Sequence, residues 1–326
     1  MEPLPRIELH LHLDCSLSYK VVHRLNPGIS ETQYRRTFIA PRKCGSLAEY
    51  LTRSPHGFRL MQSREQLRLV VEDVFEQLAA DQVIYAEIRY APLLHLEQGL
   101  KPEEVVESVD RAVEERIRGT GIEARIILCT LRHYTGGQSM QTARLVRQFR
   151  GSRVAALDIA GDEAGYPLAP HKAAFDYAHE QGLFVTAHAG EAAGAPSVWE
   201  TLNDLRPSRI GHGVRSVEDP RLLAVLRERG IHLEVCPGSN VQTNVCGSLQ
   251  DHPVDRLYRA GVSLGINTDC RTITDTTLER EYHDLSRTFA WGRGEFLRCN
   301  LAALRAAFLP DEIKRKLEAR LRTAWS

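Results

Sequence analysis

Two histidines and an aspartate stand at the end of an apolar run near the start of the chain. In the segment IELHLHLDCSL (7–17), one residue separates His10 from His12, and Asp14 follows at the next alternate position. Because side chains alternate along a β-strand, both imidazoles project from the same face. A lone histidine in a strand is usually a satisfied core residue, but two on one face are candidate ligands of a divalent metal.

Polar side chains also end later apolar runs, and two of them could complete such a metal site. His188 ends one of these runs and Asp269 ends another. Three imidazoles and one carboxylate suit Zn²⁺ and leave an open position for water, with iron or cobalt as alternatives. We therefore expect one divalent ion per chain, held by His10, His12, His188 and Asp269.

Three further positions are candidates for catalysis or substrate binding. Glu191 could transfer protons to a substrate nitrogen, or it could be a carboxylate at a helix N-terminus. His212 lies between glycines in GHG (211–213) and could orient or deprotonate a water molecule, or could be structural. In AGDEAG (160–165) the two acids could simply cap the next helix, so we assign only Gly161 to the site.

The segments that carry these residues alternate regularly between two patterns. Short runs rich in β-branched residues predict eight strands, at 6–13, 83–91, 124–131, 154–161, 183–190, 209–213, 232–237 and 262–269. Longer amphipathic segments predict helices between them, at 102–119, 171–182, 219–230 and 252–261. This alternation favours an α/β fold with a closed (β/α)₈ barrel of the TIM type, whose strand ends converge on one mouth.

Two stretches depart from the plain repeat. Residues 14–80 form a long excursion after the first strand, with helix-like pieces at 46–54 and 64–80. The stretch 277–326 has a helical pattern throughout. No linker divides the chain, so we expect one elaborated domain over 1–326, with a helical insertion after the first strand and extra C-terminal helices.

Bulk composition excludes several classes of protein. The chain has 326 residues, 42 basic and 42 acidic side chains and a formal net charge of +0, which argues against nucleic-acid binding through a basic footprint. No uncharged apolar stretch reaches about 18 residues, and no signal-peptide pattern is present, so a membrane partner is not expected. Seven cysteines without a framework spacing favour the cytoplasm. The oligomeric state stays open.

An ordered set of motifs resembles the adenosine deaminase family of the amidohydrolase superfamily. The set comprises ELHLHLD (8–14), GDE (161–163), HAGE (188–191), RIGHG (209–213), EVCPGSN (234–240), HP (252–253), INTD (266–269) and TLEREY (277–282). It spans essentially the whole chain. The resemblance implies zinc-dependent hydrolytic deamination of adenosine and 2′-deoxyadenosine to inosine and 2′-deoxyinosine, with release of ammonia.

The resemblance also implies roles for single residues. His10, His12, His188 and Asp269 would bind one zinc, which lowers the pKa of its bound water to about 7. That hydroxide would attack C6 of the purine, positioned by His212, while Glu191 donates a proton to N1. The backbone N–H of Gly161 would contact N3, and Asp14 would hold the ribose 5′-hydroxyl. Residues 14–80 would form a helical lid that excludes water.

Two positions depart from the family pattern. Cys15 replaces the usual glycine after the first-strand aspartate, and Cys270-Arg271 replaces an Asp-Pro pair. The missing aspartate normally donates a hydrogen bond to purine N7, and the neutral S–H of Cys270 is a weaker donor. Because most arginines remain exposed, we expect Arg271 to pair with a surface acid rather than to reach a substrate.

These departures keep alternatives open. The same chemistry could act on another 6-aminopurine, namely adenine, a modified adenosine or aminodeoxyfutalosine. A binuclear amidohydrolase acting on amides or esters is disfavoured because the fourth predicted strand, LDIAGDE (157–163), ends without a lysine. A non-catalytic purine-binding module is disfavoured because all four metal-ligand positions, Glu191 and His212 are present.

Overall fold

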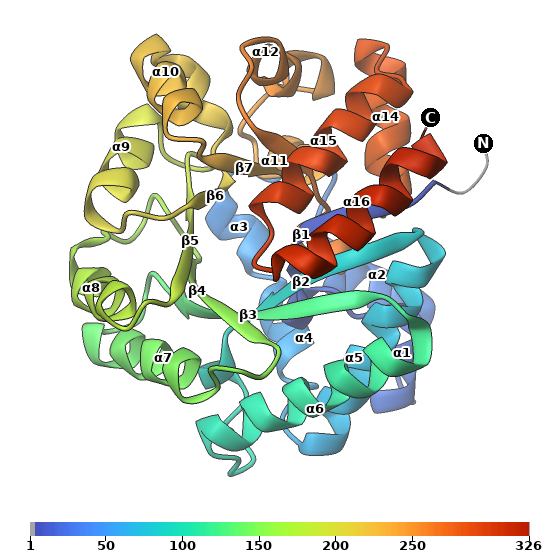
Figure 1. Ribbon diagram of the computed structural model, residues 1–326. Helices are drawn as coiled ribbons and strands as arrows, with labels where there is room; N and C mark the ends of the chain where they lie inside the picture. Colours follow the sequence, from blue (N-terminus) through green and yellow to red (C-terminus); the bar gives the residue numbers. More distant parts are fainter. Residues whose placement is uncertain (1–3, 326) are drawn as a thin grey trace.

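The computed structural model describes residues 4–325 and shows a closed ring of parallel strands (Figure 1). Of the eight strands in this range, each of the first seven pairs with the next one along the chain. They are β1 (Arg6–His12), β2 (Val83–Tyr90), β3 (Glu123–Leu131), β4 (Val154–Ala160), β5 (Phe184–Ala189), β6 (Arg209–His212), β7 (His232–Val235) and β8 (Leu264–Ile266). The predicted (β/α)₈ barrel and all eight of its strands are thereby confirmed.

The ring closes between the first and last strands by an irregular junction. β8 ends after three residues, and beyond it the Oδ1 atom of Asn267 accepts the backbone N–H of Leu9 at 2.7 Å. The backbone then pairs again, since the N–H of His12 donates to the carbonyl of Asp269 at 2.9 Å. The predicted last strand, 262–269, is therefore longer than β8. After Ile266 it is the side chain of Asn267, rather than the backbone, that pairs with β1.

Helices surround the barrel on the outside (Figure 1). The helices that follow β2 to β7 and cover the barrel are α6 (Pro102–Thr120), α7 (Gly136–Gln148), α8 (Lys172–Glu180), α9 (Ala195–Asp204), α10 (Pro220–Glu228) and α12 (Val254–Arg259), with the short α11 (Pro237–Gln242) before α12. Strands buried between these helices and the barrel interior are apolar along most of their length, as in β2, where every residue is buried.

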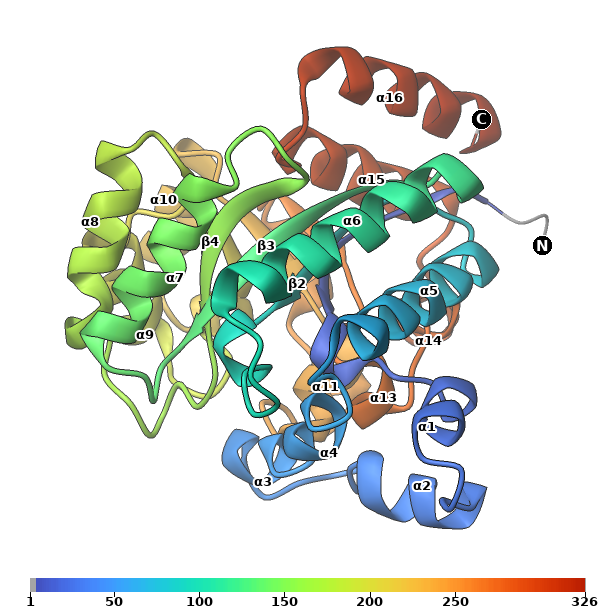
Figure 2. The ribbon, with the colours of Figure 1, turned by 90° about the horizontal axis from the view of Figure 1, so that it is seen from below.

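The excursion after β1 contains two kinds of helix. It runs through α1 (Tyr19–Leu25), α2 (Glu31–Phe38), α3 (Leu47–Leu51), α4 (Ser54–Phe58) and α5 (Arg64–Ala80). Figure 2 shows α1 to α4 gathered at one end of the barrel. In contrast, α5 buries its apolar face against β2 and α6 and so belongs to the outer helix layer. The expectation that all of 14–80 covers the mouth is therefore wrong for α5.

The C-terminal region consists of separate helices rather than one helical stretch. They are the short α13 (Arg271–Thr274), then α14 (Leu278–Phe289), α15 (Arg293–Ala306) and α16 (Asp311–Trp325). α14 ends where Ala290 adopts a left-handed φ of 56°, and Pro310 precedes α16. These two breaks divide the helical region expected over 277–326 into separate helices. α15 packs against β1 and β8, where the Oδ1 atom of Asn300 accepts the N–H of Ile7 at 2.8 Å.

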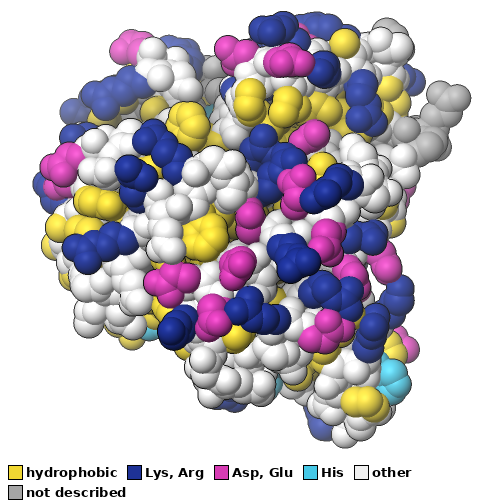
Figure 3. Space-filling view, turned by 60° about the horizontal axis from the view of Figure 1, so that its bottom comes forward, with side chains coloured by type: hydrophobic (Ala, Val, Ile, Leu, Met, Phe, Trp, Pro, Cys, Tyr) yellow, Lys and Arg dark blue, Asp and Glu magenta, His cyan; other side chains and the backbone are white. Residues whose placement is uncertain are grey.

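The surface carries mixed charge on the face seen in Figure 3, where lysines and arginines lie among aspartates and glutamates. This mixture agrees with the balanced composition of the chain. Within residues 4–325, no helix has the length and apolar character needed to cross a membrane.

Arg271 lies in the interior, and the expectation of a surface position is wrong. Its side chain is buried, with Nη2 2.5 Å from Oε2 of Glu8 and Nη1 2.7 Å from Oδ2 of Asp81. Asp81 also accepts the backbone N–H of Leu278 at 2.9 Å, at the start of α14. Two buried carboxylates need a cation because an unpaired buried charge is costly. Arg271 therefore joins β1, the end of α5 and the start of α14.

We expect Arg271→Met to lower the free energy of unfolding by about 3–5 kcal/mol, because both carboxylates would stay buried without their positively charged partner. Urea denaturation measures this loss. The control is Arg111→Met, which removes an exposed arginine 3.3 Å from Glu115 and should cost less than about 1 kcal/mol. Equal small losses in both variants would contradict the role given to Arg271.

Candidate active site

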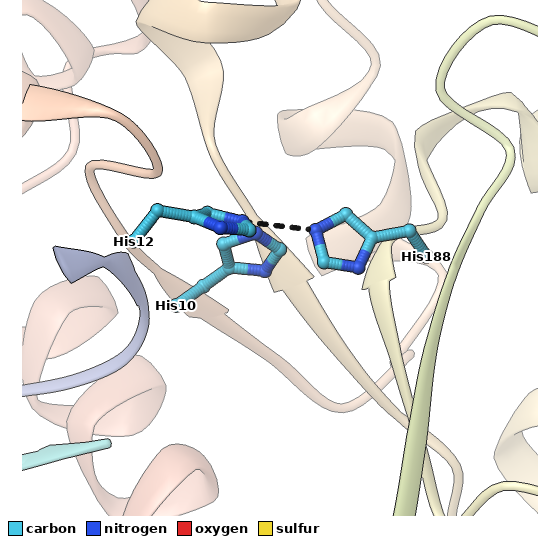
Figure 4. Close-up of side chains that lie close together, drawn as sticks. All are labelled: His10, His12 and His188. Atoms are coloured by element: carbon cyan, nitrogen blue, oxygen red, sulfur yellow. Dashed lines mark hydrogen bonds between the residues drawn. The ribbon is translucent and has the colours of Figure 1, made fainter. Parts of the chain in front are cut away.

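The barrel brings the four predicted ligands together at the C-terminal ends of its strands. His10 and His12 come from β1, and His188 comes from β5 on the opposite side (Figure 4). Asp269 follows β8. The Nε2 atoms of His12 and His188 lie 3.2 Å apart. Oδ1 of Asp269 lies 3.5 Å from Nε2 of His10 and 3.4 Å from Nε2 of His12. The candidate ligand atoms therefore face one small volume.

Carboxylates behind the rings determine which nitrogen faces this volume. Nδ1 of His10 lies 2.9 Å from Oε2 of Glu234, and Nδ1 of His188 lies 3.2 Å from Oδ1 of Asp158. Each carboxylate accepts the Nδ1–H, so the Nε2 lone pair points toward the centre. Arg89 binds both carboxylates, at 2.6 Å from Glu234 and 3.0 Å from Asp158.

Neighbouring groups keep the carboxylates of Asp158 and Glu234 ionised. Burial would raise the pKa of Asp158, but the neighbouring His188 and Arg89 hold it well below its usual range. Burial acts on Glu234 in the same direction, and Arg89 again lowers its pKa well below the usual range. The barrel interior therefore holds fixed negative charge directly behind the imidazoles.

Sequence reasoning missed Arg89, Asp158 and Glu234. All three lie inside buried strands, at positions where their neighbours are apolar. A charged side chain in a buried strand is rare unless it is paired, and this was the available signal. The sequence shows no pairing partner, because the three strands are distant along the chain and meet only in the barrel.

The donor set fits a divalent metal ion. Nε2 of His10 is buried and has no hydrogen-bond partner. Burial lowers the pKa of His12 well below its usual value and also lowers that of His188, so both rings are neutral. Nε2 of His12 and Nε2 of His188 share one hydrogen bond, and each nitrogen can instead offer its unshared electron pair to a cation placed between them. Together, His10, His12 and His188 form a group with metal-ligand spacing.

Gly211 lets the imidazoles lie against the backbone of β6. A Cβ atom at this position would be 2.9 Å from Cε1 of His10 and 3.2 Å from Cγ of His188. Next to it, His212 has a left-handed φ of 61°, and Asp269 has one of 65°. Non-glycine residues adopt this conformation rarely, and such strain concentrates at functional sites.

Glu191 is placed to hold a proton beside the ligand group. Its side chain is buried, and Oε2 lies 3.5 Å from Nε2 of His212. Burial, followed by the negative charges of Asp269 and Glu163, raises the pKa of Glu191 well above its usual value. A carboxyl group with a raised pKa keeps its proton to a higher pH and can act as an acid.

Glu163 holds the loop that carries Glu191. Its carboxylate accepts the backbone N–H groups of Gly190 at 2.7 Å, Glu191 at 3.0 Å and Ala192 at 2.6 Å. The sequence suggested that this acid caps the helix after its own strand. It binds instead the loop after β5, because the ends of neighbouring barrel strands lie side by side.

A cavity of about 450 Å³ opens above these groups. From the strand ends it is lined by His12, Asp14, Gly161, His188, Glu191, His212, Asp269 and Cys270. Across from them, the apolar side chains of Leu47, Tyr50, Leu51, Pro55 and Phe58 come from α3 and α4. His10 lies beneath the cavity rather than in its wall. The structure thus brings every predicted site residue to one place.

Cys15 and Cys270 lie together in the cavity wall. Both side chains belong to one buried cluster, and Sγ of Cys270 is 3.5 Å from Oδ1 of Asp269. Burial raises the pKa of Cys270 well above its usual value, so the thiol is neutral. Nearby, burial raises the pKa of Asp14 to about 6. The two cysteine departures from the family pattern are therefore one local change.

The chain is similar to known proteins along nearly its whole length. Residues 5–324 match the family model described as adenosine deaminase. An adenosine deaminase of Mycobacterium marinum is 37% identical over 329 residues, covering 94% of this chain and 90% of the relative. One of Clostridium perfringens is 32% identical over 322 residues, covering 97% of each.

Solved structures share the fold over nearly the whole chain. The Arabidopsis protein ADAL, complexed with IMP, has a TM-score of 0.88 at 25% identity, over 99% of this chain and 97% of that one. The adenine deaminase of Arthrobacter aurescens has a TM-score of 0.90 at 24% identity, over 98% of each chain. With its motifs, site geometry and relatives in agreement, the chain belongs to the adenosine deaminase family of the amidohydrolase superfamily and is a hydrolytic aminohydrolase.

Proposed function

We propose that the protein deaminates adenosine and 2′-deoxyadenosine to inosine and 2′-deoxyinosine, with release of ammonia. The observation that carries this proposal is the position of the buried Glu191 carboxyl group next to the cluster of facing imidazole nitrogens, at the floor of a cavity. The relatives named adenosine deaminase, at 32–37% identity, support the choice of substrate.

His10, His12, His188 and Asp269 would hold one metal ion, and we propose Zn²⁺ because three imidazoles and one carboxylate suit it. When bound, this ion supplies a Lewis acid that makes hydroxide available near neutral pH. Glu234 and Asp158 keep the ligand nitrogens of His10 and His188 directed at it.

The reaction adds the oxygen of water to C6, breaks the bond from C6 to the amino nitrogen and releases that nitrogen as ammonia. Glu191 holds a proton on its carboxyl group and donates it to N1 of the ring, which makes C6 more electrophilic. His212, 3.5 Å from Glu191, orients the attacking oxygen.

We propose positions for the rest of the substrate along the cavity wall. Asp14 would bind the ribose 5′-hydroxyl, the backbone N–H of Gly161 would contact N3, and Cys270 would face N7. The apolar side chains of α3 and α4 would act as the lid that excludes water from the reaction. The complex of ADAL with IMP, a 6-oxopurine nucleotide, supports a purine in this cavity.

A second candidate substrate class is another 6-aminopurine: adenine, a modified adenosine or aminodeoxyfutalosine. The observation that favours it is the pair of neutral thiols, Cys15 and Cys270, in the cavity wall where the family pattern has glycine and aspartate. Weak thiol donors hold a purine less tightly than a protonated carboxyl group would. Contacts with the rest of the substrate therefore contribute a larger share of the binding.

Ammonia release from a panel of these compounds tests the proposal. We expect adenosine and 2′-deoxyadenosine to have the highest kcat/KM with the zinc-loaded protein. A higher value for adenine, a modified adenosine or aminodeoxyfutalosine would instead support the second candidate. No turnover of any 6-aminopurine would overturn both.

Removal of the metal is expected to abolish turnover. Dialysis against a zinc chelator should stop ammonia release, and added Zn²⁺ should restore it, with one ion per chain by elemental analysis. His12→Gln should lose both the metal and the activity, because one ligand nitrogen is removed. The control His23→Gln, which changes an exposed residue of α1, should keep both. Full activity of the metal-free protein would contradict the site.

Glu191→Gln is expected to lower kcat about 10²–10⁴-fold while the metal content stays unchanged, because the amide fills the same space but cannot donate a carboxyl proton. Steady-state kinetics with elemental analysis measures both. The matched control is Glu180→Gln, on the exposed surface of α8, which should leave kcat unchanged. A kcat of Glu191→Gln close to that of the unaltered protein would rule out the acid role.

A further inference from the structure

A chain of buried hydrogen bonds lies behind His212. The backbone N–H of Val254 donates to Nδ1 of His252 at 3.1 Å. Nε2 of His252 lies 3.2 Å from Oδ1 of Asn240, and Nδ2 of Asn240 lies 3.1 Å from Nδ1 of His212. All three side chains are buried. Asn240 belongs to α11, and His252 precedes α12 by two residues.

The first bond in this chain assigns the proton of His252. A backbone N–H can only donate, so Nδ1 of His252 accepts and carries no hydrogen. Burial lowers the pKa of His252 to about 3, so the ring is neutral. Its one N–H is therefore on Nε2 and donates to Asn240.

The orientation of the Asn240 amide then determines which nitrogen of His212 carries the hydrogen. Only the carbonyl oxygen of an asparagine side chain can accept a hydrogen bond, so Oδ1 of Asn240 faces His252 and the amide N–H faces His212. Nδ1 of His212 must accept this N–H and carries no hydrogen. The proton of the neutral His212 ring is therefore on Nε2, on the side of the cavity and Glu191.

We propose that Asn240 and His252 are positioning residues that fix His212 as the Nε2–H tautomer, so that His212 gives a hydrogen bond to the reacting oxygen instead of taking its proton. This inference rests on the proposed function and narrows it. Sequence reasoning left open whether His212 orients or deprotonates a water molecule, and the hydrogen-bond chain favours orientation. A fixed donor in a buried site stabilises developing negative charge on oxygen without reorganisation.

Asn240→Asp tests the proposal with nearly the same side-chain shape. Both carboxylate oxygens can only accept, so the substitution forces the hydrogen of His212 onto Nδ1 and turns a lone pair toward the cavity. ¹⁵N NMR of the histidine rings in the zinc-loaded protein reads the tautomer directly, with His212→Gln to assign the signals. We expect Nε2–H in the unaltered protein and Nδ1–H in Asn240→Asp.

The kinetic expectation is a fall of kcat by about 10²-fold or more with little change in KM for adenosine, because the loss concerns one oxyanion donor and not substrate binding. A Nδ1–H tautomer in the unaltered protein would overturn the proposal. So would an Asn240→Asp variant that keeps Nε2–H, or one that changes tautomer but keeps kcat.

A second pair of variants keeps the test decisive if Asn240→Asp does not fold. His252→Leu removes the donor, so the amide of Asn240 can turn over, and we expect mixed tautomers of His212 and a lower kcat. His252→Gln retains an N–H donor and should recover most of the Nε2–H form and part of the lost activity. Equal tautomer populations in these two variants would contradict the proposal.

His232→Gln serves as the control for replacing a buried histidine. Nδ1 of His232 bonds Oγ of Ser263 at 2.9 Å, and the side chain does not line the cavity. We expect it to leave the tautomer of His212 and kcat unchanged. The NMR readout needs no substrate, so a failure of the proposed function on every 6-aminopurine stays distinguishable from a wrong tautomer.

Discussion

The ion pairs of Arg89 with Asp158 and Glu234 are the constraint on which the site depends. This arginine lies inside the barrel, fully buried, and its charge keeps two buried carboxylates ionised. Those carboxylates in turn hold the Nδ1–H groups of His188 and His10. Without Arg89, burial would favour the protonated form of Asp158, which then could orient His188 less firmly, whereas Glu234 would keep Arg209 at 2.8 Å.

Hydrogen bonds also hold other residues around the cavity in place. Glu163 orders the loop of Glu191 through backbone N–H groups, and Oδ2 of Asp269 accepts the hydroxyl of Ser239 at 2.6 Å. Asn240 performs the corresponding task for His212. The side chains proposed to touch the substrate or the metal are thus held from behind by groups that do neither, which reduces reorganisation during the reaction.

The departures from the family pattern have separate consequences. Cys15 and Cys270 lie together in the cavity wall, so they change the surface of the cavity. Arg271 points away from that surface into an ion-pair cluster with Glu8 and Asp81. Because the backbone turns into the short α13 at this point, Cys270 faces the cavity while the adjacent Arg271 belongs to the buried ion pairs.

The sequence alone determined the eight strands, the barrel and the residues at the strand ends, since β-branched runs and alternating polarity are local properties of the chain. It also placed His10 and His12 on one face. Only the tertiary structure decided which groups meet: that Glu234 and Asp158 stand behind the imidazoles, that Glu163 binds a neighbouring loop, and that Arg271 is buried. Such pairings join residues far apart along the chain, and no local pattern encodes the distance between them.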